Sequence, residues 1–128
     1  MKLISFLLTV VVGLSLTALS GQAAEKTGKL FHVVSFKFKD TATPEQIKDV
    51  DKAFRDLRNK IPGIKSLDAG TNVSPEKLNK SFTHAWVLTF ASEKDRDNYL
   101  VHPAHKAFGA SLGPVLADVF VIDFWSEK

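Results

Sequence analysis

Apolar and polar residues alternate along residues 30–38 of this 128-residue chain, and a period of two predicts a β-strand. The same alternation recurs at residues 82–90 and 119–125, whereas residues 64–70 give a weaker strand signal. We therefore expect four strands. One face of the first strand is expected to carry Leu30, His32, Val34, Phe36 and Phe38.

Two segments between these strands have the spacing of apolar residues that is typical of amphipathic helices. The first helix is predicted to begin at a capping box formed by Thr43 and Gln46, with Pro44 at the first helical position. Pro62-Gly63 ends it. The second helix is predicted to begin at Ser92. The stripe that the first helix buries is predicted to hold Ile47, Val50, Phe54 and Leu57.

The second helix is expected to break at Pro103, because the residue before a proline is pushed out of the α region. A short helix over residues 103–112 follows the break. The element order is then βαββαβ, which predicts an α+β, ferredoxin-like domain with a four-stranded antiparallel sheet and its helices on one face.

The strands raise a packing problem, because they carry apolar residues on both faces and the helices can cover only one. The uncovered face would expose Val33, Val87, Phe120 and Ile122. Soluble monomers rarely tolerate such a patch. Two sheets that face each other across a twofold axis would bury it, so we expect a homodimer.

The amino terminus has the pattern of a secretory signal: Lys2, an apolar run over residues 3–19, and small and polar residues after it. We predict a signal peptide over residues 1–23 and a domain over residues 24–128, secreted or periplasmic and with no stable membrane association after cleavage. Cleavage after Ser20 or Ala24 also fits the pattern. An uncleaved membrane anchor is the alternative.

Charge and composition narrow the function classes. The 17 basic and 14 acidic residues are interspersed and give a net charge of +3 without a basic stripe, so we expect no nucleic acid partner. No phosphate-binding glycine loop, dinucleotide fingerprint or nucleophile elbow is present, and we expect no cofactor. The chain has no cysteine, so it has no disulfide.

The strongest candidate for chemistry is the run Tyr99-Leu-Val-His102-Pro103-Ala-His105 around the predicted helix break. His105 would lie in the first turn of the helix after Pro103, where the helix dipole disfavours protonation. A neutral imidazole near the phenol of Tyr99 is a usable acid/base pair. The alternative is a capped helix break with surface histidines.

Polar residues in the apolar strands are the second group of candidates. His32 and His84 lie on otherwise apolar faces, and Asp123 is a carboxylate in an apolar strand. The first and last strands are neighbours in a ferredoxin-like sheet, so Asp123 can fix the tautomer of His32. Trp86 and Phe54 would supply apolar pocket walls, or else are plain core.

The four histidines also raise the alternative of a metal site, since zinc and copper favour imidazole. However, the spacing of His102 and His105 across a proline is not a known ligand motif. We therefore predict no metal ligands.

Several segments resemble the stress-responsive A/B barrel domain family of dimeric α/β barrels. The resemblance is carried by residues 32–39, Ile61-Pro62-Gly63, Thr83-His84, residues 99–105 and residues 121–124. It implies a ferredoxin-like fold that dimerises through its sheets. A plant polyketide cyclase of the family drives an intramolecular aldol cyclisation with a histidine and a tyrosine, which implies His105 as the base and Tyr99 as the partner that holds the carbonyl oxygen.

The resemblance also implies a ligand pocket between sheet and helices, with His32 and His84 in its wall. We expect a small apolar or carbonyl-containing ligand and cofactor-free lyase or cyclase chemistry. Non-catalytic binding or carriage of a small molecule is the alternative. The substrate-binding residues are predicted to be His32, His84, Trp86, Phe54 and Asp123.

Overall fold

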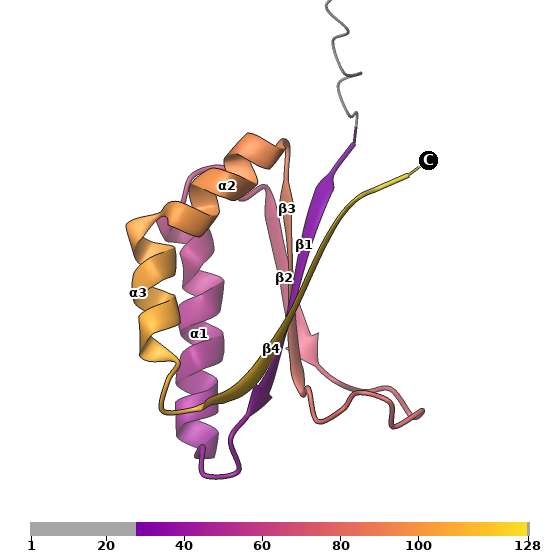
Figure 1. Cartoon of the computed structure of the whole chain (residues 1–128), viewed down its shortest axis with the longest axis vertical. Coiled ribbons are helices and arrows are strands. Elements are labelled where there is room, and N and C mark those ends of the chain that lie inside the picture. Colours follow the sequence, from indigo (N-terminus) through magenta and orange to yellow (C-terminus); the bar gives the residue numbers. More distant parts are fainter. Residues whose placement is uncertain (1–27, 128) are drawn as a thin grey trace, which may run out of the picture.

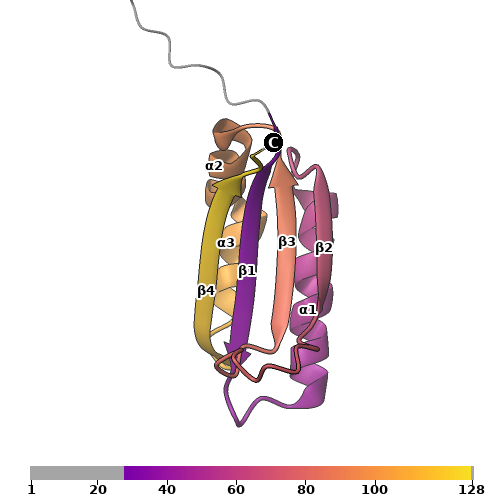
Figure 2. The same ribbon diagram turned by 90° about the vertical axis from the view of Figure 1, so that its right-hand side faces the viewer.

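A computed structural model describes residues 28–127 and confirms the ferredoxin-like α+β architecture. Four strands form one sheet in the order β2-β3-β1-β4, and three helices cover one of its faces (Figure 1). The other face, called the open face below, carries no helix (Figure 2). The elements are β1 (Leu30–Phe38), α1 (Pro44–Lys60), β2 (Ser66–Thr71), β3 (His84–Phe90), α2 (Glu93–Val101), α3 (Pro103–Ser111) and β4 (Leu116–Trp125).

Strand β1 is central and has the predicted alternation. Buried and partly buried residues alternate along the whole strand, and the buried residues face the helices. It pairs antiparallel with β3 on one side and β4 on the other, so that Val34 lies opposite both Trp86 and Val121. This register places His32 of β1 directly opposite Asp123 of β4.

Helix α1 begins at the predicted capping box. The Thr43 hydroxyl accepts from the Gln46 backbone N–H at 3.2 Å, and the Gln46 side chain accepts from the Thr43 N–H at 2.9 Å. The predicted apolar stripe is confirmed, since Val50, Phe54 and Leu57 are the buried residues of the helix. These two capping bonds satisfy backbone donors that the first turn would otherwise leave unpaired.

Three strand boundaries differ from the predicted ones. Strand β3 begins at His84 rather than at residue 82, because the preceding loop turns at Lys80 and Ser81, which have positive φ angles of 50° and 65°. Strand β2 is displaced to Ser66–Thr71, and β4 begins at Leu116 instead of residue 119. The extra residues of β4 continue its pairing with the end of β1 beyond a register shift.

The predicted break in the second helix is confirmed. Helix α2 ends at Val101, His102 has an extended backbone (φ −64°, ψ 138°), and α3 starts at Pro103. The two helices meet at a marked angle (Figure 1). His102 thus links the last turn of α2 to the first turn of α3.

Aromatic rings fill the space between the sheet and helices α1 and α3. Trp86 is fully buried, and its ring centroid lies 4.7 Å from that of Phe36 and 4.6 Å from that of Phe54. Phe108 of α3 packs edge-on to Phe54 at 5.1 Å. The indole N–H of Trp86 donates to Asp51 at 2.9 Å, so this buried polar group is satisfied.

The open face exposes the apolar patch that the sequence predicts. Phe120, Ile122 and Phe124 of β4 keep about half of their surface exposed, at 51%, 48% and 47%. Phe31 of β1 stacks on Phe124 at a centroid distance of 5.0 Å. The open face thus carries exposed apolar side chains along β4, with the Phe31–Phe124 stack extending them to β1.

The predicted signal peptide over residues 1–23 lies outside the described residues. Within residues 28–127, no helix combines the length and the apolar character that a membrane crossing requires.

Candidate functional site

Tyr99 and His105 meet across the break between α2 and α3, with ring centroids 4.5 Å apart. Tyr99 occupies the last turn of α2 and His105 the first turn of α3. A continuous helix would place residues six apart on different faces. The extended backbone at His102 redirects the chain and brings the two rings together, so Pro103 is indirectly responsible for the pair.

The imidazole of His105 is held in its neutral form. Its Nδ1 lies 3.1 Å from the carbonyl oxygen of Leu100 and donates to it, which leaves the lone pair of Nε2 available. Burial lowers the pKa of His105, and the charge of nearby His32 lowers it further, against the opposing effect of the Leu100 bond. The imidazole is therefore unprotonated at neutral pH.

The phenol of Tyr99 is held in its protonated form. Burial raises the pKa of Tyr99, and the carboxylate of Asp123 raises it further, so the phenol stays protonated. The side chain is only 1% exposed, and its hydroxyl makes no hydrogen bond within residues 28–127. No fully buried side-chain polar atom of the described residues lacks a partner, so the hydroxyl oxygen itself keeps some accessible surface. Buried tyrosine hydroxyls usually have a partner. This one is free to donate to a bound oxygen.

His102 has a structural role instead. Its Nδ1 accepts a hydrogen bond of 3.0 Å from the backbone N–H of Ala104 and so caps α3. An accepting Nδ1 places any proton of the neutral ring on Nε2, the opposite tautomer to that of His105. The two histidines that flank Pro103 therefore differ in tautomer and in hydrogen-bond partner.

The expected contact between Asp123 and His32 is confirmed, with 2.6 Å between Oδ1 and Nδ1. His32 is 4% exposed, and its ring lies edge-on to Tyr99 at a centroid distance of 5.5 Å. Because a carboxylate only accepts, Nδ1 of the neutral ring carries the proton. Nε2 then keeps its lone pair and has no hydrogen-bond partner within the described chain.

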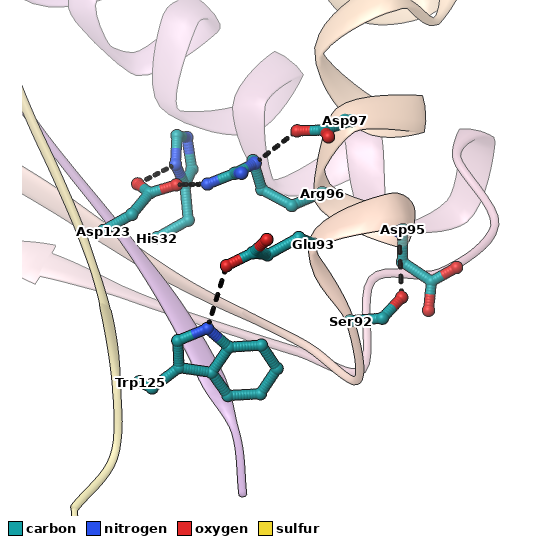
Figure 3. A network of polar contacts seen from close by, with 8 residues as sticks. All are labelled: His32, Ser92, Glu93, Asp95, Arg96, Asp97, Asp123 and Trp125. Carbon is teal, nitrogen blue, oxygen red and sulfur yellow. Dashed lines mark hydrogen bonds and ion pairs between the residues drawn. The ribbon is translucent and has the colours of Figure 1, made fainter. Parts of the chain in front are cut away.

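Sequence reasoning missed Arg96, which completes this network (Figure 3). Its guanidinium donates to the second carboxylate oxygen of Asp123 at 2.5 Å and, through Nε, to Asp97 at 2.7 Å. The bond to Asp123 raises the pKa of Arg96. One signal was available in the sequence, because Arg96 precedes Tyr99 by three residues and so shares its helix face.

His84 does not join the other histidines. It pairs with Phe36, whereas His32 pairs with Leu88, so the two histidines are about 13 Å apart along the sheet. Its Nδ1 lies 2.9 Å from the Thr83 hydroxyl. Burial lowers the pKa of His84. The structure therefore places His84 at the far end of the aromatic core from the Tyr99–His105 pair.

Trp86 and Phe54, the expected pocket walls, are packed against each other in the core. Neither presents surface to a ligand in this arrangement, and the pocket between sheet and helices stays a prediction. A cavity of about 690 Å³ lies instead on the open face, where Val33, Val87 and Phe120 line it. A second cavity, of about 580 Å³, borders Arg96, Asp123 and Trp125.

No group of three or more histidine, aspartate or glutamate side chains is arranged to hold a metal ion in the described part of the chain. The histidines are instead divided between the Tyr99–His105 pair, the Asp123 contact, the α3 cap and the far end of the core.

The sequence of this chain is similar to a known protein family and to a characterised plant enzyme. The model of the family described as Stress responsive A/B Barrel Domain matches residues 30–126. Olivetolic acid cyclase from Cannabis sativa is 30% identical over 97 residues, which cover 76% of this chain and 96% of the cyclase.

Two solved structures are similar over most of the chain. Hydroxynitrile lyase from Passiflora edulis superposes with a TM-score of 0.73 at 25% identity, covering 79% of this chain and 95% of the lyase. A dimeric ferredoxin-like protein of unknown function from Thermobifida fusca superposes with a TM-score of 0.67 at 28% identity, covering 81% and 97% of the two chains.

Proposed function

The chain belongs to the stress-responsive A/B barrel domain family, and we propose that it is a cofactor-free acid/base catalyst of the lyase or cyclase type. In this proposal His105 removes a proton from the carbon next to a carbonyl group, and the Tyr99 hydroxyl donates to the oxygen on which negative charge develops. The substrate is a small, largely apolar carbonyl compound.

One observation carries the proposal: a neutral imidazole with a free Nε2 lies against a buried phenol whose hydroxyl has no partner within the described residues. Proton abstraction next to a carbonyl needs a base that takes the proton and a hydrogen-bond donor near the carbonyl oxygen. The donor stabilises the negative charge that develops on that oxygen as the enolate forms. The enzyme names of two relatives, a cyclase and a hydroxynitrile lyase, support the same class of chemistry.

Deuterium exchange tests this chemistry without the natural substrate. The protein is incubated with 4-phenylbutan-2-one in D₂O, and loss of the proton signals next to the carbonyl is followed by NMR. We expect catalysed exchange with the wild type and a loss of roughly 10²–10⁴-fold with His105→Gln, the usual contribution of a general base. Wild-type exchange no faster than buffer would contradict the proposal.

His102→Asn is the matched control, because it removes a histidine three residues away. Asparagine is a good N-cap, so it preserves the start of α3. We expect exchange within a factor of about two of the wild type, since general-base catalysis is assigned to His105 alone. A loss as large as that of His105→Gln would show that the helix break, not the base, controls the rate.

Non-catalytic carriage of a small apolar molecule is the second candidate function. The cavity of about 690 Å³ on the open face favours it, since Val33, Val87 and Phe120 line part of it with apolar surface. In the homodimer proposed below, this cavity would lie at the interface between the two sheets. Native mass spectrometry of the purified protein tests for a co-purified molecule. A tightly held compound together with no exchange activity would favour carriage over catalysis.

The proposal includes a homodimer that buries the open face. The exposed side chains of Phe120, Ile122 and Phe124 support it, as does the dimeric relative from Thermobifida fusca. It also includes export after removal of residues 1–23, on the pattern of Lys2 and the apolar run that follows. Intact mass of the protein from its native host tests export, and a full-length mass in the membrane fraction would contradict it.

A further inference from the structure

We propose that residues 72–83, which connect β2 to β3 and are called the arm below, contact a second copy of this chain through the side chain of Leu78. The inference goes beyond the acid/base chemistry, and it rests on the homodimer that the proposed function includes. It gives a binding role to a segment that lies outside the Tyr99–His105 site.

The arm projects from the end of the sheet at which β3 begins, on the side that carries no helix (Figure 1). In the view onto the open face, it crosses the lower end of the sheet (Figure 2). The two ends of the arm are joined by a backbone hydrogen bond of 2.8 Å from Asn72 to Thr83. Phe82 lies edge-on to Phe120 of the open face, at a centroid distance of 6.5 Å. The arm therefore adjoins the surface that the homodimer would bury.

The backbone of the arm has an unusual conformation for a segment without glycine. Within residues 28–127, the non-glycine residues with positive φ are Lys77, Lys80 and Ser81, and all three lie in the arm. Such a conformation costs free energy and persists only where the surroundings impose it. The Asn79 amide, which donates to the Phe82 carbonyl at 3.0 Å, is one such constraint. A constrained arm loses less conformational entropy when it binds a partner.

Leu78 is an apolar side chain that the arm leaves 65% exposed. It lines the cavity of about 690 Å³, together with Phe82 of the arm and with Val33 and Val87 of the sheet. This cavity is thus a space between the arm and the open face. A second copy seated on the open face would enter the space and cover Leu78, which removes apolar surface from water.

The shape of the open face selects the part of the second copy that enters this space. One row across the sheet holds, in order, Gly70, Ala85, Ser35 and Phe120. Three small residues thus form a hollow over β2, β3 and β1, beside a ridge of large residues on β4. A twofold axis parallel to the strands lays the β4 ridge of each copy over the hollow of the other. An axis perpendicular to the strands lays ridge on ridge and leaves the hollow empty, so close packing favours the parallel axis.

The parallel axis also brings each arm to the start of β4 in the second copy, because β3 and β4 begin at the same end of the sheet. The charges of the two segments are complementary. The arm carries Glu76, Lys77 and Lys80, a net charge of 2 − 1 = +1. Both lysines are exposed and have no ion pair within the described residues, and the exposed Asp118 at the start of β4 has none either. Attraction between these groups favours the contact of the arm with β4 of the second copy.

Cysteine labelling tests the contact directly, because the chain has no cysteine of its own. Leu78→Cys is reacted with a water-soluble maleimide as the dimer and as the monomer, obtained by dilution or with Ile122→Glu added. We expect the labelling rate to rise at least about tenfold on dissociation, since interface contacts exclude water. Val73→Cys is the matched control, because Val73 belongs to the arm but does not line the cavity. Its rate should change by less than about twofold, as for a site outside the contact.

A second variant measures the strength of the contact. Leu78→Asn is expected to raise the dimer dissociation constant at least about tenfold in sedimentation equilibrium, because it removes an apolar side chain from the interface. Leu100→Asn, at a 40% exposed position of α2, should leave the constant unchanged.

The outcomes separate the arm from the homodimer. Equal labelling of Leu78→Cys in dimer and monomer would overturn the inference and leave the homodimer standing, as would an unchanged dissociation constant in Leu78→Asn. A wild type that is monomeric at micromolar concentration would count against the homodimer itself.

Discussion

The rings of Trp86 and Phe54 lie parallel, with planes 4° apart and centroids 4.6 Å apart. This stack joins the centre of β3 to the middle of α1 and occupies the volume where a pocket between sheet and helices was predicted. The Tyr99–His105 pair and the Asp123–His32 contact lie beyond one end of it. The polar side chains of the candidate site therefore lie outside the volume that this stack fills.

Removal of the Phe54 ring should be strongly destabilising, because it leaves a cavity against Trp86. Phe54→Ala is expected to lower the free energy of unfolding by about 3–5 kcal/mol, measured by urea denaturation. Val101→Ala, at an exposed position of α2, is the control and should cost less than about 0.5 kcal/mol. Similar losses in the two variants would contradict the tight packing of the Trp86–Phe54 stack.

A charge on the open face should prevent dimerisation. Ile122→Glu is expected to convert the dimer to monomer or unfold it, because a buried and unpaired carboxylate costs several kcal/mol. Val73→Glu adds the same charge at a loop position that is 90% exposed, and it should leave the dimer intact. Sedimentation velocity distinguishes these cases, and a wild-type monomer at micromolar concentration would refute the dimer.

The exchange activity should persist at mildly acidic pH. The pKa of His105 is lowered from its ordinary value of 6.5, so the base remains neutral as the pH falls through that value. We expect the acid limb of the exchange rate to have its midpoint below 6.5. A rate profile of 4-phenylbutan-2-one exchange measures it, and a midpoint above 6.5 would contradict the burial of this imidazole.

The free energy of unfolding should decrease as the pH is lowered through the same range. The pKa values of His84 and His105 are both lowered in the folded state, so the unfolded chain binds more protons once the pH drops below about 6.5. The contribution is complete above that pH and is lost on acidification. Urea denaturation as a function of pH measures the slope, which should be smaller in His105→Gln.

The same substitution should have opposite effects at two glycines. Gly63 has a φ of +96°, and an added Cβ would lie 3.3 Å from the Cβ of Asp95, so Gly63→Ala is expected to cost about 1–2 kcal/mol. Gly109 lies in α3 with open space around it, and Gly109→Ala should stabilise by about 0.5–1 kcal/mol. Thermal denaturation compares the two, and equal shifts would contradict the strained turn at Gly63.

The patterns of β1 and α1 were predictable because burial in these two elements is one-sided. The alternation over residues 30–38 and the stripe on α1 follow directly from which side faces the core. Strand β4 was predicted only in part, since its first residues, Leu116 to Asp118, do not alternate. Backbone pairing with β1 extends the strand there, and pairing leaves no periodic signal in a sequence.

The sequence predicted the contact between His32 and Asp123 and the helix break at Pro103, but not the packing of Trp86 or the role of Arg96. The pairing of His32 with Asp123 follows from the strand order, and the break at Pro103 follows from proline chemistry. Whether Trp86 lines a pocket or fills the core depends on the volume of the rings that face it, which periodicity does not report. Arg96 lies on a helix rich in charged residues, where the sequence does not distinguish one partly buried ion pair from exposed charges.

The pairing of β1 with β4 also has a consequence for synthesis and folding. Leu30 at the start of β1 lies opposite Trp125 at the end of β4, so the last strand of the domain forms an edge of the sheet by pairing with the first. A nascent chain can form α1 early, but it has no partner for that side of β1 until β4 has left the ribosome. Contacts between such distant residues form slowly. The carboxylate that orients His32 is thus synthesised late, and a truncated chain that lacks β4 would retain Tyr99 and His105 while losing the acceptor of the His32 Nδ1 hydrogen bond.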